Sequence, residues 1–218
     1  MKNLINLGEQ NSIFNQFIKE IRSAKIQKDS MRFRRNIERI GEIFAYEISK
    51  KLSFETETVT TPLGDCDIEV PKGNPVIATV LRAGLPLHQG ILNYFDQAEN
   101  AFVSAYRKHT TADDFEVQVE YMSGPTLKGK TLILCDPMLA SGQSMVLAYK
   151  ALIEEYGQPE HVHIVAIIAS SEGLQYLAKN VRSKATFWMG AIDSEMTAQS
   201  YIIPGLGDAG DLAYGQKE

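Results

Sequence analysis

Three short, almost continuously apolar runs constrain the fold of this 218-residue sequence more than any other feature. They cover Val76–Leu81, Thr131–Cys135 and His161–Ala169, and each is followed by a turn and then by a segment with helical spacing. Strands that are apolar on both faces are typical of parallel sheets, because the helices that connect the strands cover both faces. The alternation therefore predicts an α/β fold with a mostly parallel sheet flanked by helices.

Periodicity places the remaining elements. Apolar residues recur every three or four positions from Phe33 to Leu52, which predicts an amphipathic helix with Asp29 or Ser30 as its N-cap. Alternating β-prone stretches around a Pro-Leu-Gly-Asp turn predict a β-hairpin arm at 57–70. Further strands are expected at 102–106, 115–122 and 185–191, and helices near 87–95, 142–156 and 172–179. We expect one domain over 1–218.

Composition excludes several classes of protein. The net charge of −5 gives no global field to attract nucleic acid, and the basic stretch from Lys19 to Arg39 is read as a solvated helix face or subunit contact. No apolar run approaches the roughly 20 residues of a membrane span, and the N-terminus lacks the pattern of a signal peptide. Two cysteines, Cys66 and Cys135, predict reduced thiols in a cytoplasmic protein.

The residues after the strand at 131–135 have the pattern of an anion site. Ligands of open α/β sheets bind beyond the carboxyl ends of the strands, and here Asp136–Ser144 leads into a helix. An acidic side chain can accept hydrogen bonds from sugar hydroxyls, and small residues followed by a helix N-terminus can bind a phosphate. An ordinary strand-to-helix turn with a serine cap remains an alternative. The segment lacks the Gly-Lys-Ser/Thr of a P-loop, and the chain has no G-x-G-x-x-G motif.

Two further strand ends and a C-terminal segment also carry polar motifs. Arg82-Ala83-Gly84 follows the strand at 76–81, and Tyr106-Arg107 ends the next predicted strand. An arginine at such a place can bind two phosphate oxygens, although a surface salt bridge is the more common role. The glycine- and proline-rich segment Tyr201–Asp211 predicts an irregular loop.

These motifs together resemble the uracil phosphoribosyltransferase family. Asp136–Ser144 is similar to the family signature D-P-M-L-A-T-G-G-S, with Ser141 in place of the threonine and Gln143 in place of a glycine. Tyr201–Asp211 matches the family string Y-I-[IV]-P-G-L-G-D-A-G-D throughout. Arg82 lies in the family's Leu-Arg-Ala-Gly-Leu, and Tyr106-Arg107 resembles its Tyr-Arg. The resemblance covers about 31–215 in the same order.

The resemblance implies a phosphoribosyltransferase-like fold with a small C-terminal hood, residues 192–218, that recognises the base. The implied reaction, a step of pyrimidine salvage, joins uracil to phosphoribosyl pyrophosphate (PRPP) and yields uridine 5′-monophosphate (UMP) and pyrophosphate. Asp208 and Arg107 are the implied catalytic residues. The implied PRPP-binding residues are Arg82, Arg107, Asp136, Pro137, Met138, Leu139, Ala140, Ser141, Gly142, Gln143, Ser144 and Asp208. The implied uracil-binding residues are Ile202, Gly207, Asp208 and Ala209.

The family also implies Mg²⁺ as cofactor, held by PRPP oxygens and water and not by a set of protein ligands. It implies a lid at Lys108–Asp114 and a homodimer or higher homo-oligomer, with the helix at 31–52 as a candidate interface. Some relatives respond to a purine nucleotide. Two alternatives stay open: a phosphoribosyltransferase for another base, and a PRPP-binding regulator without turnover. Gln143, the divergent lid segment and the divergent residues after Asp211 keep the regulator open as an alternative.

Overall fold

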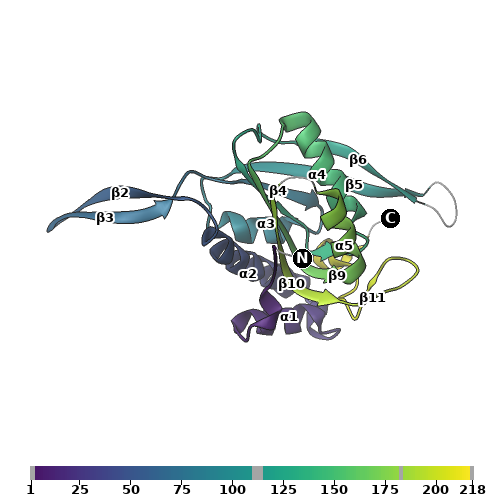
Figure 1. The fold of residues 1–218 in the computed structure, drawn as a ribbon. Coiled ribbons are helices and arrows are strands. Elements are labelled where there is room, and N and C mark those ends of the chain that lie inside the picture. The colour runs from purple at the N-terminus through teal and green to yellow at the C-terminus, as the bar shows by residue number, and fades with distance from the viewer. Residues whose placement is uncertain (1–2, 110–114, 182–183, 217–218) are drawn as a thin grey trace.

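The fold is built on one large sheet. The computed structural model describes residues 3–109, 115–181 and 184–216, with the backbone alone for 105–109 and 115–119. An eight-stranded sheet runs in the order β1-β10-β9-β7-β4-β5-β6, and the short strand β8 pairs with β9. All its strand pairs are parallel except β5–β6. The prediction of a mostly parallel sheet flanked by helices is confirmed (Figure 1).

The elements follow one another in alternation through most of the chain. The strands are β1 (Leu4–Asn6), β2 (Phe54–Thr61), β3 (Gly64–Pro71), β4 (Val76–Leu81), β5 (Glu99–His109), β6 (Phe115–Ser123), β7 (Thr131–Cys135), β8 (Met138–Leu139), β9 (His161–Ser170), β10 (Ala185–Asp193), β11 (Glu195–Met196) and β12 (Ile202–Ile203). The helices are α1 (Ile13–Arg22), α2 (Ser30–Ser49), α3 (Leu85–Leu92), α4 (Gln143–Tyr156), α5 (Ser171–Asn180) and α6 (Ala209–Tyr214), with 3-10 turns η1 (Leu7–Glu9) and η2 (Ile26–Lys28). None of the helices in the described ranges is both long and apolar enough to cross a bilayer.

The predicted core elements are confirmed, and the main differences concern β5, β1 and α1. Asp29 is the N-cap of α2 and accepts a hydrogen bond from Arg32 N at 3.0 Å. Strand β5 continues to His109 because β6 pairs with it, so Arg107 lies inside a strand and not at its end. Strand β1 and helix α1 were not predicted. Strand β1 pairs with β10 and forms that edge of the sheet, and helix α1 packs in the core on the neighbouring face.

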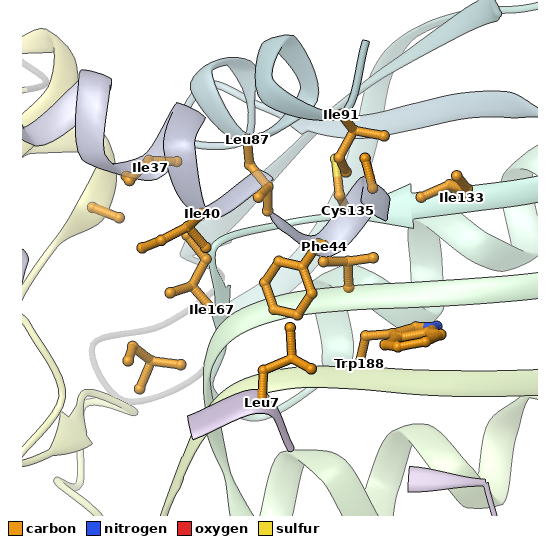
Figure 2. Close-up of a cluster of buried hydrophobic side chains, with 14 of the residues drawn as sticks. Leu7, Ile37, Ile40, Phe44, Leu87, Ile91, Ile133, Cys135, Ile167 and Trp188 are labelled. Carbon is orange, nitrogen blue, oxygen red and sulfur yellow. The ribbon is translucent and has the colours of Figure 1, made fainter. Parts of the chain in front are cut away.

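Two apolar cores hold the helices against the two faces of the sheet. On one face α1, α2 and α3 pack with strand residues such as Ile133 and Trp188, and Figure 2 shows Phe44 and Leu87 among the side chains of this core. On the other face α4 and α5 pack on β4, β7 and β9. The C-terminal residues Ile202, Leu206, Ala209 and Ala213 belong to the first core. The C-terminal segment is therefore attached to the α1–α2 layer.

The predicted hairpin arm is confirmed and is slightly longer than expected. Strands β2 and β3 form a separate antiparallel pair that extends away from the body of the molecule (Figure 1). All of its residues except Val70 are exposed, and Leu63 at the tip is fully so.

Candidate active site

The strand-end motifs meet at one edge of the sheet. Strand β4 lies between β7 and β5, so Arg82–Gly84 and Asp136–Ser144 leave neighbouring parallel strands at their carboxyl ends. Arg107 lies on β5, the strand on the other side of β4. Since the carboxyl edge is where ligands bind in such sheets, the fold brings the backbone of three predicted PRPP motifs to one place.

The Asp136–Ser144 loop is tied to β9 and to the start of α5. Asp136 N donates to Val165 O at 3.1 Å, and Met138 and Leu139 pair with β9 as strand β8. The Ala140 carbonyl accepts a 2.6 Å hydrogen bond from the Ser170 hydroxyl, which also caps α5. These contacts leave the small residues that follow Ala140 at the N-terminus of α4.

The left-handed position of this loop is occupied by a glycine. Gly142 has φ +78°, and a Cβ there would come within 2.7 Å of the Gly173 carbonyl oxygen. Gln143 is the exposed first residue of α4, and Ser200 is the one non-glycine residue with positive φ in the described ranges. Gln143 is therefore compatible with the loop geometry. The N-cap residue Gly142 has no side chain to cap α4, and the Ser141 hydroxyl accepts only a long, 3.5 Å hydrogen bond from Gln143 N. Within the described residues, the next N–H groups of the first turn are therefore available to an anion.

Asp136 is the most strongly perturbed acid at this edge. Burial raises its pKa to about 7, the N–H of Met138 at 3.1 Å from Oδ1 opposes the rise, and the negative charge of Asp208 adds to it. Asp136 and Asp208 are 72 positions apart in sequence. Their interaction places the predicted sugar-binding turn and the C-terminal segment within electrostatic reach of each other.

Arg82 makes a second link between the strand ends and the C-terminal segment. Its Nη2 donates to the Gly215 carbonyl at 3.2 Å and lies 3.7 Å from Asp211 Oδ1. Its Nε is buried and has no acceptor among the described residues, so the guanidinium has donor capacity left. Gly84 allows the tight turn, because a Cβ there would lie 2.0 Å from Thr79 Oγ1.

The C-terminal segment is an ordered loop. Strands β11 and β12 pair antiparallel, with Met196 opposite Ile202. The Ile203–Pro204 peptide is cis, and Gly205 and Gly207 have positive φ. Ile202 and Ala209 are buried, whereas Gly207 and Asp208 are exposed. The four predicted uracil-binding residues thus lie on one short, folded stretch.

Asp208 has a local structural role that sequence reasoning missed. Its side chain caps α6 by accepting a hydrogen bond from Asp211 N at 2.9 Å. The Asp-x-x-Asp spacing is a recognisable start of a helix. The cap directs Oδ1 towards the helix, and within the described residues Oδ2 makes no hydrogen bond.

Sequence reasoning also missed Arg22 and Asp193, which contact the C-terminal segment at Gly205. Asp193 ends β10, so the rule that polar residues at strand ends mark a site could have found it. Arg22 ends an unpredicted helix. The side chain of Arg107 and the predicted lid residues 110–114 lie outside what the structure describes.

A groove of about 440 Å³ lies elsewhere, between the second half of α4 and the end of α5, and includes Lys150, Glu154 and Lys179. It contains none of the predicted site residues. Because α4 begins at the Asp136–Ser144 loop, the groove is at the far end of that helix.

The comparisons with known protein sequences agree on one family. A family model described as uracil phosphoribosyltransferase matches residues 9–216. A uracil phosphoribosyltransferase of Porphyromonas gingivalis is 54% identical over 214 residues, which are 98% of this chain and 99% of that protein. One of Thermococcus gammatolerans is 36% identical over 204 residues, 91% of this chain and 89% of the relative.

Solved structures are similar in fold. The AQ2163 protein of Aquifex aeolicus superposes with a TM-score of 0.85 at 27% identity and covers 97% of this chain and 98% of its own. An adenine phosphoribosyltransferase of Trypanosoma brucei gives a TM-score of 0.54 at 15% identity, with 88% and 84% covered. The second likeness supports the fold alone.

Proposed function

The chain belongs to the uracil phosphoribosyltransferase family, and we propose that it transfers the phosphoribosyl group of PRPP to uracil, releasing pyrophosphate. The observation that carries this proposal is the meeting of two motifs. Arg82 follows β4, the strand beside the one that leads into the Asp136 turn, and it donates to Gly215 and lies 3.7 Å from Asp211, so the C-terminal segment reaches the carboxyl ends of these strands. A sugar phosphate at one and a flat base at the other would share one cleft.

PRPP is assigned to the carboxyl edge of the sheet. The 5-phosphate is assigned to Ala140–Ser144, where Ser141, Ser144 and the N-terminus of α4 offer donors. Asp136, in its ionised form, would accept hydrogen bonds from the ribose hydroxyls. The backbone turn at Pro137–Leu139 would hold the sugar in place. Arg82 and Arg107 are assigned to the pyrophosphate, since a guanidinium can bind two phosphate oxygens.

Uracil is assigned to the C-terminal segment. Backbone groups of Ile202, Gly207, Asp208 and Ala209 can recognise the carbonyl and N–H pattern of the ring edge, because peptide groups held in a fixed loop match such a planar pattern. Residues 192–218 would then form the hood of the single domain. Asp208 is the proposed group that orients or deprotonates the base nitrogen as it attacks the ribose carbon.

Catalysis in this scheme is positioning and charge stabilisation. As the bond to pyrophosphate lengthens, positive charge develops on the ribose carbon, and the arginines stabilise the departing anion. A lid formed by 108–114 would exclude water from that carbon. No covalent intermediate on the protein is needed.

Mg²⁺ is the proposed cofactor, and it would enter on PRPP. Mg²⁺ keeps several waters and is commonly held by substrate phosphates with one or two carboxylates. Asp136 and Asp208 are oxygen donors of the required kind beside the proposed PRPP site, whereas no group of three acidic, histidine or cysteine side chains gathers within the described residues. When bound, Mg²⁺ would neutralise part of the pyrophosphate charge.

We also propose a homodimer or higher homo-oligomer in the cytoplasm. On one face of the hairpin Thr58 donates to Asp67 at 2.7 Å, and the other face gathers Val59, Cys66 and Ile68, with Glu57 opposite Ile68. An isolated two-stranded hairpin is marginally stable, so a second copy is the proposed cover for the apolar face. Cys66 is exposed and forms no disulfide, which suits a reducing compartment. A purine nucleotide remains a proposed effector.

The test is formation of UMP from uracil, PRPP and Mg²⁺, with guanine, hypoxanthine and xanthine in parallel. We expect turnover with uracil and at least about 100-fold less with the purines, because a site that hydrogen-bonds one base edge rejects others strongly. Arg82→Ala and Asp136→Asn should each lower kcat/KM by about 100-fold or more with an unchanged circular dichroism spectrum. PRPP binding without UMP formation would support the regulator instead, and full activity of either variant would refute the assigned site.

A further inference from the structure

Both backbone hydrogen-bonding groups of Gly205 are held by side chains from outside the loop Tyr201–Asp211. Gly205 N donates to Asp193 Oδ2 at 3.0 Å, and the Gly205 carbonyl accepts from Arg22 Nη1 at 3.0 Å. Asp193 is the last residue of β10, and Arg22 is the last residue of α1. One anchor therefore comes from the sheet and the other from the N-terminal layer.

The two anchors are themselves joined by a two-pronged ion pair. Arg22 Nη1 lies 2.7 Å from Asp193 Oδ2, and Nη2 lies 2.9 Å from Oδ1. The side chains are 21% and 9% exposed. Burial raises the pKa of Asp193, but the hydrogen bonds from Arg22 and from Gly205 N outweigh burial, so the pKa lies below its usual value. The carboxylate is charged and has no freedom to turn away from Gly205.

Gly205 is well placed to control the base-reading groups. It lies between Ile202 and Gly207, which carry two of the backbone groups assigned to uracil. Its φ is +51°, and a Cβ at this position would come within 2.2 Å of the Ile202 carbonyl oxygen. The turn is thus folded tightly back on Ile202, and a shift of the Gly205 backbone would move the groups on either side.

Two other side chains of the N-terminal layer hold the same segment by its carbonyls. Gln27 donates to the Leu206 carbonyl at 3.1 Å when its amide is oriented to suit its neighbours. Arg34 Nη1 donates to the Ala213 carbonyl at 2.6 Å. The Arg22–Asp193 pair is distinct among these contacts because it fixes an N–H and a carbonyl of one residue.

We propose that Arg22 and Asp193 are positioning residues for base recognition: they hold Gly205 so that the backbone on both sides presents a fixed pattern to uracil. This inference rests on the proposed function. Neither residue touches the reacting atoms in this scheme. A mere fold-stabilising role would lower stability without favouring one substrate, whereas a positioning role raises the KM for uracil and leaves the KM for PRPP nearly unchanged.

The variants are chosen so that no buried charge is left alone, because an unpaired buried charge could prevent folding. Arg22→Gln combined with Asp193→Asn removes the ion pair and keeps a neutral polar side chain at both positions. Arg22→Lys keeps the charge but cannot form the fork. The matched control is Arg32→Gln combined with Glu20→Gln. Arg32 and Glu20 form an equivalent fork, with Nε–Oε2 and Nη2–Oε1 both at 2.9 Å, and within the described residues it makes no hydrogen bond to the C-terminal segment.

In UMP-formation assays we expect the Arg22/Asp193 variant to raise the KM for uracil about tenfold or more and the KM for PRPP less than about twofold, since misplaced binding groups cost this much. Arg22→Lys should recover part of the loss. The control should change both constants less than about twofold. Equal increases in both KM values, or the same uracil effect in the control, would overturn the proposal.

Two measurements need no turnover. Hydrogen exchange of the Gly205 and Leu206 amides should be about tenfold faster in the Arg22/Asp193 variant and unchanged in the control. The calorimetric Kd for UMP should rise about tenfold while that for PRPP stays within about twofold. A wild-type chain that forms no UMP contradicts the proposed function, and the effect of the Arg22/Asp193 variant on UMP affinity then tests the positioning role by itself. Unchanged hydrogen exchange and unchanged UMP affinity in that variant would refute the positioning role.

Discussion

Asp136 is the residue at which burial acts most directly on the proposed chemistry. Its carboxyl group would accept hydrogen bonds from ribose hydroxyls, and it can do so with both oxygens only when ionised. Burial and the nearby charge of Asp208 raise its pKa to about 7. The free protein therefore changes its affinity for the sugar near neutral pH.

The sign of this effect can be worked out for folding and for binding. An acid whose folded pKa is raised binds its proton more tightly in the folded state, so its contribution to stability falls as pH rises from about 3.8 to about 7. Ionisation over the same range prepares the carboxylate for PRPP. Stability and binding thus respond to pH in opposite directions at this residue.

We predict that kcat/KM for PRPP rises with pH through an apparent pKa near 7 and levels off above it. PRPP has ionisable phosphates of its own, so the matched comparison is Asp136→Asn. This variant should lack the step while retaining any dependence that comes from the substrate. Identical pH profiles for the two proteins would show that Asp136 does not titrate in the working range.

At the scale of elements, one buried acid holds the two N-terminal helices together. Helices α1 and α2 are joined by Glu20, which accepts from Arg32, from Asn36 at 2.7 Å and from Gln16 at 3.0 Å. The hydrogen bonds from Arg32, Asn36 and Gln16 lower the pKa of Glu20 to about 2. The joint therefore contributes stability only while Glu20 is ionised.

The acid range of this contribution follows from the pKa values. An acid whose pKa is lowered by folding stabilises the folded state above its unfolded pKa of 4.5. This contribution is lost as the pH falls from 4.5 to about 2. We predict that Glu20→Gln lowers the free energy of unfolding by about 2 kcal/mol at pH 7 and that the difference from wild type shrinks at pH 3. Urea denaturation at both pH values measures it. Glu155→Gln, at an exposed position of α4, is the control and should change neither value. A constant difference between pH 7 and pH 3 would contradict the assignment.

Local sequence was sufficient to predict the elements around the site but not the contacts between them. Strands β4, β7 and β9 were found because each is apolar on both faces, and α2 because its spacing and N-cap agree. Helix α1 carries the same kind of signal in Phe14, Phe17, Ile18 and Ile21 and was still missed. Strand β1 has three residues, too few for a periodic pattern.

The long-range anchors could not be predicted in this way. Arg22 and Asp193 are 171 positions apart, and neither has a neighbour in sequence that identifies the other. Asp208 was predicted as a ligand residue from a motif, while its capping of α6 is decided by where the helix begins. Motifs locate segments, whereas the fixing of their backbone depends on residues that only the tertiary fold brings close.

At the scale of the whole molecule, the hairpin stands apart from an otherwise well-packed body. The two cores cover both faces of the sheet, and β2 and β3 share in neither. Opposite residues of an antiparallel pair lie on the same face, so Val59 with Cys66 and Glu57 with Ile68 form one face of the arm. The other face carries the Thr58–Asp67 hydrogen bond.

This asymmetry predicts that the apolar face mediates self-association. The wild-type chain should have twice or a higher multiple of its 24.3 kDa mass by light scattering at micromolar concentration. Ile68→Asp puts a second negative charge opposite Glu57 on that face and should shift the protein to single chains, because burial of an unpaired charge is costly. Thr60→Asp is the matched control, since it creates the same kind of like-charge pair with Asp65 on the polar face. It should leave the oligomer intact. A monomeric wild type, or dissociation by both variants alike, would remove the reason for assigning this face to a second copy.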